Sequence, residues 1–311
     1  MGFDALIDHL RNPDAELKRS LLCKLSGLMP DDQETLRGAW SDVPAERRAA
    51  IVSGIVALAD DHIELDFVPA LRVALDDDDA EVRAAAAAGL WETDDRIVIT
   101  PLVSMLEADE SAEARAAAAT TLGHFVDLAE AGKLIKRDAA RLCDALRRAL
   151  EDRQEEALVR RRALEALAPL AGRDIIGWVR WAYACGDPAY RQSALYAMGR
   201  TCDAAWLPYV VDEMGSANPA MRFEAANAAR GIADPESLPH LHELVSDDDA
   251  QVAVAAVQAI GAVGGAVARK LLRRYAETGE SYVSAAAEEA LAALDVDDMD
   301  FTMLSLREED E

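Results

Sequence analysis

A segment that recurs every 31 residues constrains the fold of this chain more than any other feature of its sequence. Each copy is a pattern of twelve residues. An acid stands at the first position, an apolar residue at the fourth, usually Arg at the fifth, Ala at the eighth, a small residue at the eleventh and an apolar residue at the twelfth, and the other positions vary. The clearest copies begin at Asp187, Asn218 and Asp249 and read DPAYRQSALYAM, NPAMRFEAANAA and DAQVAVAAVQAI. A fixed period of this length is typical of a solenoid, in which each repeat packs on its neighbours.

The apolar positions within one copy predict an amphipathic helix. They fall at the fourth, eighth, eleventh and twelfth residues, a spacing that gathers them on one helical face. An oxygen-bearing side chain at the first position can accept N–H groups of the first turn, and proline is tolerated directly after it. Another amphipathic run, such as LPYVVDEM, lies upstream, so one repeat is predicted to be helix, turn, helix. The second helices are expected to start near Asp14, Pro44, Asp79, Ser111, Glu156, Asp187, Asn218, Asp249 and Glu280.

Small residues and a recurring cation indicate how the repeats stack. The eighth position is Ala in the last seven copies, which allows neighbouring helices to approach closely. A hairpin of this size cannot bury enough apolar surface alone, so the repeats must pack on one another. Arg or Lys follows the apolar fourth position in seven copies, and we expect these cations to pair with the acidic caps of stacked repeats. They are Lys18, Arg48, Arg83, Arg115, Arg160, Arg191 and Arg222.

The repeated segment resembles the HEAT repeat, in its short phycobilisome-lyase-like form (HEAT_PBS). It shares the period, the Ala positions, and the pair formed by an acid at the first position and Arg at the fifth. The resemblance implies an all-α, right-handed α-solenoid of about nine HEAT-like helical hairpins. The array is expected to span residues 1–294, with an insertion within 123–140, and to be followed by an acidic tail at 295–311. Proteins of this architecture include adaptors, assembly factors and a few enzymes, so the resemblance implies only a curved surface lined by the second helices.

The tail departs from the repeat and contains a short apolar island between acidic blocks. Its members are Phe301, Met303, Leu304 and Leu306. The island would either fold back to cap the last hairpin or dock on a partner as a linear motif.

A formal net charge of −26 narrows the class of partner. It argues against non-specific binding to nucleic acid or to an anionic membrane, because phosphate-rich surfaces would be repelled. Only five of the 32 basic residues are Lys, which favours salt adaptation in a halophilic host, with recognition of a basic partner as the alternative. The amino terminus lacks the bases of a secretory signal, and Gly264 and Gly265 are expected to form a turn within the uncharged run at 252–268, so we expect a cytoplasmic protein.

Charge and aromatic residues are concentrated in the middle of the chain. Residues 133–200 contain 14 Lys and Arg against 9 Asp and Glu, in a strongly acidic protein. The sixth and tenth positions of each second helix should point away from the stacking core, and there the central repeats carry large polar and aromatic side chains. We expect a partner segment, acidic or phosphorylated, to bind at these positions and at Arg230, which lies one turn beyond the tenth position. The expected binding residues are Arg161, Gln192, Tyr196, Phe223, Asn227 and Arg230.

Signals for catalysis are weak, and the sequence favours a non-catalytic, protein-binding scaffold without cofactor or metal. Four cysteines occur without a CxxC pair, and His240 and His242 face different directions on a predicted helix. Deoxyhypusine hydroxylase, an iron enzyme of similar architecture, relies on several His-Glu pairs, whereas only His242 followed by Glu243 matches here. The alternative is a bilin lyase or isomerase-like enzyme, which the resemblance permits and which would need an aromatic cleft around Trp178, Trp181 and Trp206.

Overall fold

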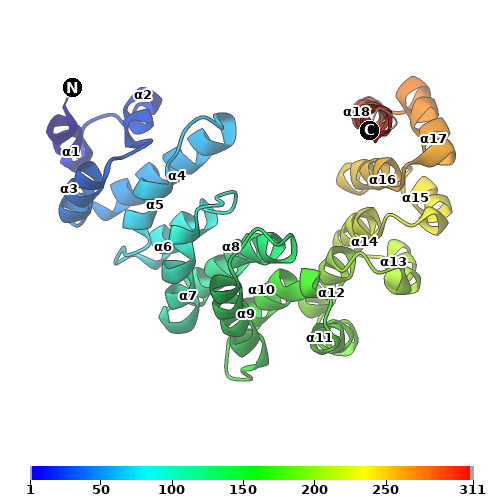
Figure 1. Ribbon diagram of the computed structural model, residues 1–311, viewed down its shortest axis with the longest axis horizontal. Coiled ribbons are helices and arrows are strands. Elements are labelled where there is room, and N and C mark those ends of the chain that lie inside the picture. The colour runs from blue at the N-terminus through cyan, green and yellow to red at the C-terminus, as the bar shows by residue number, and fades with distance from the viewer. Residues whose placement is uncertain (1, 309–311) are drawn as a thin grey trace. The chain divides into compact units, whose positions relative to one another are not determined.

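The computed structural model describes residues 2–308, and the side chains of residues 2–296. Within this range the chain is an α-solenoid of 18 α-helices and five short 3-10 helices, without a β-strand. The helices divide into two compact units, Met1–Leu167 and Ala168–Glu311, each of which is described by itself (Figure 1).

The first unit stacks helical hairpins in two layers. Its second helices pack in the order α4, α6, α8 and α10, while α5 packs on α3 and α9 on α7 in the other layer. The elements are α1 (Phe3–Arg11), α2 (Arg19–Leu22), η1 (Cys23–Leu25), α3 (Pro30–Trp40), α4 (Ala45–Asp61), α5 (Val68–Ala74), α6 (Ala80–Ala88), η2 (Arg96–Val98), α7 (Ile99–Ala108), α8 (Ala112–Glu130), α9 (Lys136–Glu151) and α10 (Ala157–Leu167).

The second unit repeats the same arrangement. Its second-helix layer is α12, α14, α16 and α18, which pack side by side in this order, and α11, α13, α15 and α17 cover one side of that layer (Figure 1). The elements are η3 (Ala168–Leu170), α11 (Arg173–Ala184), α12 (Pro188–Arg200), η4 (Ala204–Trp206), α13 (Leu207–Met214), α14 (Pro219–Ile232), η5 (Pro235–Ser237), α15 (Leu238–Leu244), α16 (Ala250–Val263), α17 (Gly265–Thr278) and α18 (Ser281–Glu308).

Side-chain caps explain where the second helices begin. Five residues at the first position of the repeat accept a backbone N–H of the following turn, namely Asp79, Ser111, Asp187, Asn218 and Asp249. Asp95, Asp203 and Asp234 cap the 3-10 turns that lead into first helices in the same way. Acceptors at both helix starts of a repeat satisfy amide groups that would otherwise lack partners.

The helix expected to start near Asp14 does not form there. Asn12 accepts the N–H of Asp14 at 3.0 Å, and the His9 ring is bonded to the Glu16 carbonyl at 3.0 Å. These local bonds compete with helix formation, so α2 starts only at Arg19. Lys18 consequently lies outside any helix, with its ammonium 3.5 Å from Glu16 on the surface.

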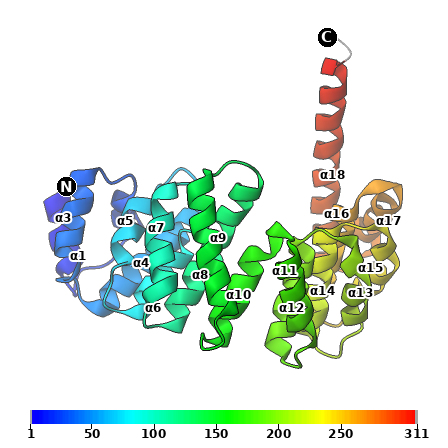
Figure 2. The same cartoon turned by 60° about the horizontal axis from the view of Figure 1, so that its bottom comes forward.

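The residues around the expected insertion lengthen helices. They extend α8 to Glu130 and delay α9 until Lys136, with a short connection between. The turn expected at Gly264 and Gly265 is confirmed, because both have positive φ, +65° and +78°, and separate α16 from α17. At the other end, α18 continues past 294 to Glu308 without a helix end where the repeat pattern stops (Figure 2). The side chains of the tail's apolar island lie outside the described residues.

Three of the predicted cations form two-pronged rungs of a ladder, but with partners other than the predicted caps. Arg83 donates from Nε and Nη2 to Asp109, both at 2.7 Å, and Arg222 donates to Asp247 at 2.6 and 2.8 Å. Arg115 binds Glu155 in the same two-pronged way. These acids lie one or two residues before the cap of the next repeat, because the guanidinium spans the turn and the cap itself is occupied by the helix start.

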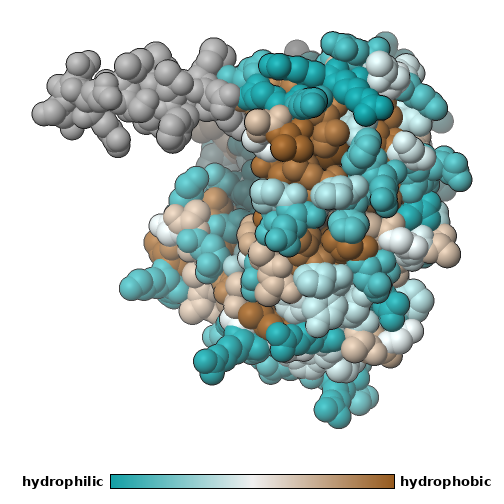
Figure 3. Space-filling model, turned by 90° about the vertical axis from the view of Figure 1, so that its right-hand side faces the viewer, coloured by the Kyte–Doolittle hydropathy of each residue, from teal (hydrophilic) through white to brown (hydrophobic). Residues whose placement is uncertain are grey.

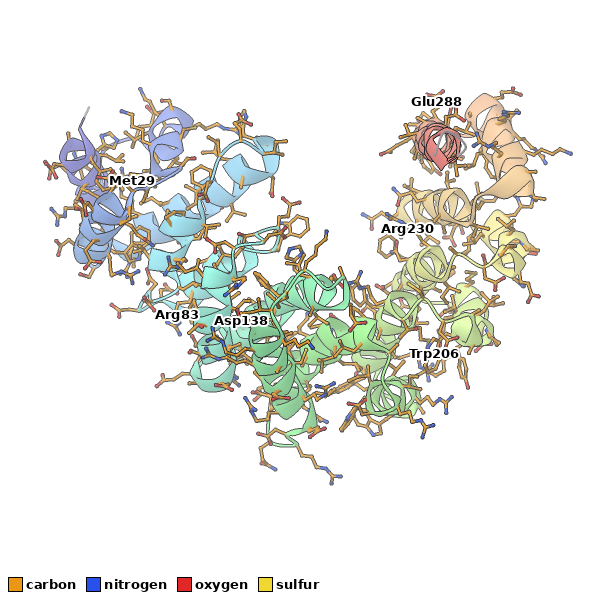
Figure 4. All side chains as sticks on the ribbon, in the orientation of Figure 1. Met29, Arg83, Asp138, Trp206, Arg230 and Glu288 are labelled. Atoms are coloured by element: carbon orange, nitrogen blue, oxygen red, sulfur yellow. The ribbon has the colours of Figure 1, made fainter. Side chains whose placement is uncertain are left out.

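Each ladder arginine also holds its own repeat. Nη1 of Arg83 donates to the backbone carbonyl of Asp77 at 2.7 Å, and Nη1 of Arg222 donates to the backbone carbonyl of Ser216 at 2.9 Å. Arg83 lies between α6 and the next hairpin in Figure 4. One side chain therefore joins the turns of two successive repeats.

The second helices of the second unit touch at backbone distance. A Cβ added to Gly231 on α14 would lie 2.3 Å from the carbonyl oxygen of Gly199 on α12. A Cβ on Gly199 would lie 2.7 Å from Cα of Ala228. Neither neighbour can move without shifting a helix, so α12 and α14 depend on glycine at this crossing.

Gly231→Ala is expected to lower the free energy of unfolding by about 1–3 kcal/mol, because overpacking forces the two helices apart. Gly177→Ala is the matched control, since Gly177 lies within α11 with no atom within 4 Å of an added Cβ. That control should stabilise the protein by about 0.4–1 kcal/mol through reduced backbone entropy of the unfolded chain. Urea unfolding followed by circular dichroism distinguishes the two, and equal midpoints for both variants would contradict the close contact.

Acid should weaken the ladder. The hydrogen bonds from Arg222 hold the pKa of Asp247 below its usual range, so this carboxylate binds its proton more weakly when folded. Its contribution to stability is present above the unfolded pKa, about 3.9, and is lost as pH falls through the lower folded pKa. Asp247→Asn should therefore be less stable than the parent at neutral pH, with a difference that shrinks below about pH 4. The exposed neighbour Asp248→Asn is the control and should show little difference at any pH.

Candidate protein-binding surface

Five of the six predicted binding residues lie together on the second-helix layer of the second unit. Gln192 and Tyr196 are on α12, and Phe223, Asn227 and Arg230 are on α14, the neighbouring helix. The period of the repeat places Gln192 at the same position as Phe223, and Tyr196 at the same position as Asn227. We call these five residues the α12–α14 patch.

The patch exposes large side chains next to tightly packed alanines. Tyr196 is 42% exposed and Phe223 is 36% exposed, whereas Ala194 and Ala225, two residues away on the same helices, are fully buried. Gln192 and Asn227 are half-buried and Arg230 is exposed. Arg230 lies on the side of α14 and α16 away from α15 (Figure 4).

Arg161, the sixth predicted residue, lies on α10 and belongs to the first unit. It is half-buried. Glu165, one turn further along α10, accepts a bond of 2.6 Å from Arg162. Because Arg161 belongs to the first unit, we do not include it in the α12–α14 patch.

A cleft of about 270 Å³ adjoins Arg230 between α14, α16 and α18. Its walls are largely small residues, including Gly261 and Ala290, and its polar groups come from Arg230, Gln258 and Glu289. Gln258 and Glu289 occupy the tenth position of the next two repeats, 31 and 62 residues after Asn227. The same period that identified Asn227 therefore identifies them, although the sequence-based prediction did not include either residue.

The aromatic residues near the start of the second unit pack against one another. Trp178 and Trp181 meet edge to face with ring centroids 5.5 Å apart, and Trp181 meets Tyr190 at 5.0 Å. Trp206 is 3% exposed, and its ring centroid lies 5.7 Å from that of Tyr209.

The surface of the second unit carries apolar patches separated by polar side chains. Figure 3 shows them from the right-hand side of Figure 1.

Tyr183 connects this aromatic group to the ladder. Its hydroxyl donates to Glu213 at 3.0 Å, and the Arg191 guanidinium lies 5.3 Å from its ring centre and 3.5 Å from the same carboxylate. Burial, together with the negative charge of Glu213, raises the pKa of Tyr183 to about 12. Tyr183 is therefore a protonated hydrogen-bond donor at neutral pH rather than a catalytic base.

The histidine of the single His-Glu pair is engaged in a hydrogen bond. His242 Nδ1 is hydrogen-bonded to the hydroxyl of Tyr275 on α17. Among the side chains of residues 2–296, no three His, Cys, Asp and Glu are grouped so that they could hold a metal ion. None of the described helices combines the length and apolar composition needed to cross a lipid bilayer.

The model for HEAT repeats matches this chain over residues 34–123, 68–168, 177–255 and 207–292, which together cover most of it. Human deoxyhypusine hydroxylase is 32% identical over 112 residues, which are 35% of this chain and 37% of that enzyme. The mouse enzyme is 29% identical over 120 residues, 38% and 40% of the respective chains. The chain thus spans no more than two fifths of the length of these curated relatives.

A solved structure has a fold similar to that of this chain. The complex that forms phycocyanin lyase in Nostoc sp. PCC7120 contains a chain with a TM-score of 0.55 and 15% identity, over 91% of this chain and 97% of the other. At this identity the likeness concerns the fold alone.

Proposed function

This chain belongs to the HEAT-repeat family, and we propose that it is a non-catalytic scaffold or assembly factor that holds a segment of a partner protein on the α12–α14 patch. The observation that carries the proposal is the exposure of Tyr196 and Phe223 on neighbouring helices whose other large apolar side chains are buried. Aromatic residues and Arg contribute most of the energy in protein interfaces, and both kinds are present here. A repeat array stacks its core internally and leaves such a surface open to a partner.

The chemistry of the partner segment follows from Arg230 and the adjoining cleft. An exposed guanidinium binds a carboxylate or phosphate through two parallel hydrogen bonds, which favours an acidic or phosphorylated segment. Small walls at Gly261 and Ala290 allow the backbone of such a segment to approach closely. Glu289 on the opposite side of the cleft would accept an N–H group from the same segment.

Arg230→Glu is expected to weaken partner capture by about tenfold or more, because it replaces the attractive charge with a repulsive one. The measurement is affinity capture from a lysate of the source organism, at its own salt concentration, with quantitation of each captured protein. Arg273→Glu is the matched control, an exposed arginine on α17 in the first-helix layer with the same change of charge.

Phe223→Ser should give the same loss as Arg230→Glu if one partner segment covers both residues. Circular dichroism should show unchanged helix content in all three variants, since the altered side chains are exposed or half-exposed. If the captured proteins are the same for Arg230→Glu and the parent, the α12–α14 patch is not the binding surface.

The alternative function is that of a bilin lyase or isomerase-like enzyme, favoured by the likeness to the phycocyanin lyase complex. Its chromophore would have to insert among Trp178, Trp181 and Trp206, whose rings are in edge-to-face contact with other aromatic rings. A shift in the visible absorption of a free bilin on adding the protein, abolished by Trp181→Ala, would support this alternative.

Hydroxylase chemistry fits the residues less well. His242-Glu243 is the single His-Glu pair in the sequence, and His242 is bonded to Tyr275. Deoxyhypusine hydroxylase relies on several such pairs, and this sequence contains one.

A further inference from the structure

We propose that the first unit carries a second docking site, an apolar cavity with a carboxylate rim that takes an apolar side chain from a basic segment of a partner protein. The cavity measures about 270 Å³. It lies between the end of α4, the connection to α5, and the turn that follows α6. It is separate from the α12–α14 patch and does not depend on the function proposed for that patch.

Two large apolar side chains stand exposed at this cavity. Ile63 is 96% exposed and Trp91 is 53% exposed, and both line it. The inner wall is formed by Phe67 and Leu71, which are 3% and 2% exposed. An exposed Trp beside a packed apolar wall is typical of the anchor positions of protein interfaces.

Gly89 determines how closely the walls of the cavity meet. A Cβ added to this residue would lie 2.5 Å from Cγ2 of Val56 on α4 and 3.3 Å from Cδ1 of Leu71 on α5. The end of α6 therefore packs directly on α4 and α5, which fixes the turn that presents Trp91. A cavity built on such contacts is formed before a partner arrives.

The charged groups that line the cavity are carboxylates. Asp60, Asp66 and Glu92 line it, and no Lys, Arg or His is among its lining residues. Asp66 is held in place because it accepts the N–H of Val68 at 3.0 Å. The surrounding stretch, residues 60–95, contains twelve Asp and Glu against two Arg.

These charges select one class of occupant. A second copy of this chain carries a net charge of −26, so it would be repelled, as would nucleic acid and anionic lipid. A small cation would be drawn to the carboxylates but would have no contact with Ile63 and Trp91. A protein segment with a Leu or Phe flanked by Lys or Arg satisfies both the apolar walls and the acidic rim.

The test uses fluorescein-labelled peptides of defined pattern and the full chain. The first peptide has Leu at i, i+3, i+4 and i+7 and Lys at most other positions. The second peptide replaces each Lys with Glu, and the third replaces each Leu with Ser. Fluorescence anisotropy at about 0.15 M salt, where long-range attraction is screened, measures the affinity of each. We expect the Leu/Lys peptide to bind about tenfold or more tightly than either counterpart.

Variants then locate the binding. Ile63→Ser, and separately Asp60→Lys with Glu92→Lys, should weaken binding of the Leu/Lys peptide by about tenfold or more. The double variant Asp4→Lys with Glu110→Lys makes the same change of charge at exposed residues of the first unit that do not line the cavity, and should leave affinity within about twofold. Because Ile63 is almost fully exposed, its replacement leaves the fold intact.

Three outcomes would overturn the proposal. One is binding of the Ser/Lys peptide as tight as that of the Leu/Lys peptide, which would mean attraction by charge alone. Another is equal loss in the control double variant. The third is self-association of the parent chain that Ile63→Ser abolishes, which would make the occupant a second copy. Arg230→Glu should not change binding of the Leu/Lys peptide, so failure of this site and failure of the α12–α14 patch are distinguishable.

Discussion

The two-pronged bond between a ladder arginine and the carboxylate of the following repeat is the interaction on which the stacking depends. The same carboxylate also organises the next helix start, because Asp109 accepts the N–H of Ser111 and Asp247 accepts that of Asp249. Each link therefore connects a guanidinium, a half-buried acid and the start of a helix. Since the arginine must reach both its own turn and the next, it limits the distance between successive turns, whereas the number of residues between its two ends varies from 25 for Arg222 and Asp247 to 40 for Arg115 and Glu155.

One rung of the ladder differs from the others although it lies in a repeat of regular length. At Arg191 the guanidinium lies 3.5 Å from Glu213, and the hydroxyl of Tyr183 donates to the same acid. The Tyr183 hydroxyl thus donates a hydrogen bond to the ladder acid, whereas at the other rungs the arginine donates both hydrogen bonds to that acid. Tyr183, one of the aromatic residues near the start of the second unit, therefore has a structural role.

The sequence predicted the helix starts well where the cap is a local interaction. Asp187 and Asn218 cap helices because the acceptor and the amide it binds are two residues apart, a relation that the sequence contains. It failed at Asp14, where Asn12 and His9 form competing bonds whose outcome depends on how the chain folds back on α1. It placed the ladder partners at the caps because the reach of a guanidinium across a turn is a property of three dimensions.

The candidate sites differ in how far the sequence could reveal them. Tyr196 and Phe223 follow from the repeat frame, since the sixth and tenth positions are the ones that stacking leaves open, and Arg230 lies one turn beyond the tenth position on the same helix. Arg161 has the right position in the frame but lies in the other unit, and a period carries no information about where compact units divide. The cavity joins segments from three helices and their connections, and its exposed residues Ile63 and Trp91 lie outside the repeated positions, so periodicity could not identify it.

The acidity of the chain has several separable uses. Asp79 and Asp249 cap helices, and Asp109 and Asp247 hold the ladder, so part of the negative charge is fixed by the fold. Exposed carboxylates such as Asp60 and Glu92 contribute to none of these bonds. Salt screens exposed charges strongly and partly buried pairs weakly, so a rise in ionic strength leaves the ladder intact while it weakens recognition through the acidic rim. In a concentrated salt solution the apolar wall formed by Phe67 and Leu71 must then supply most of the affinity, and this is where Ile63 and Trp91 stand exposed.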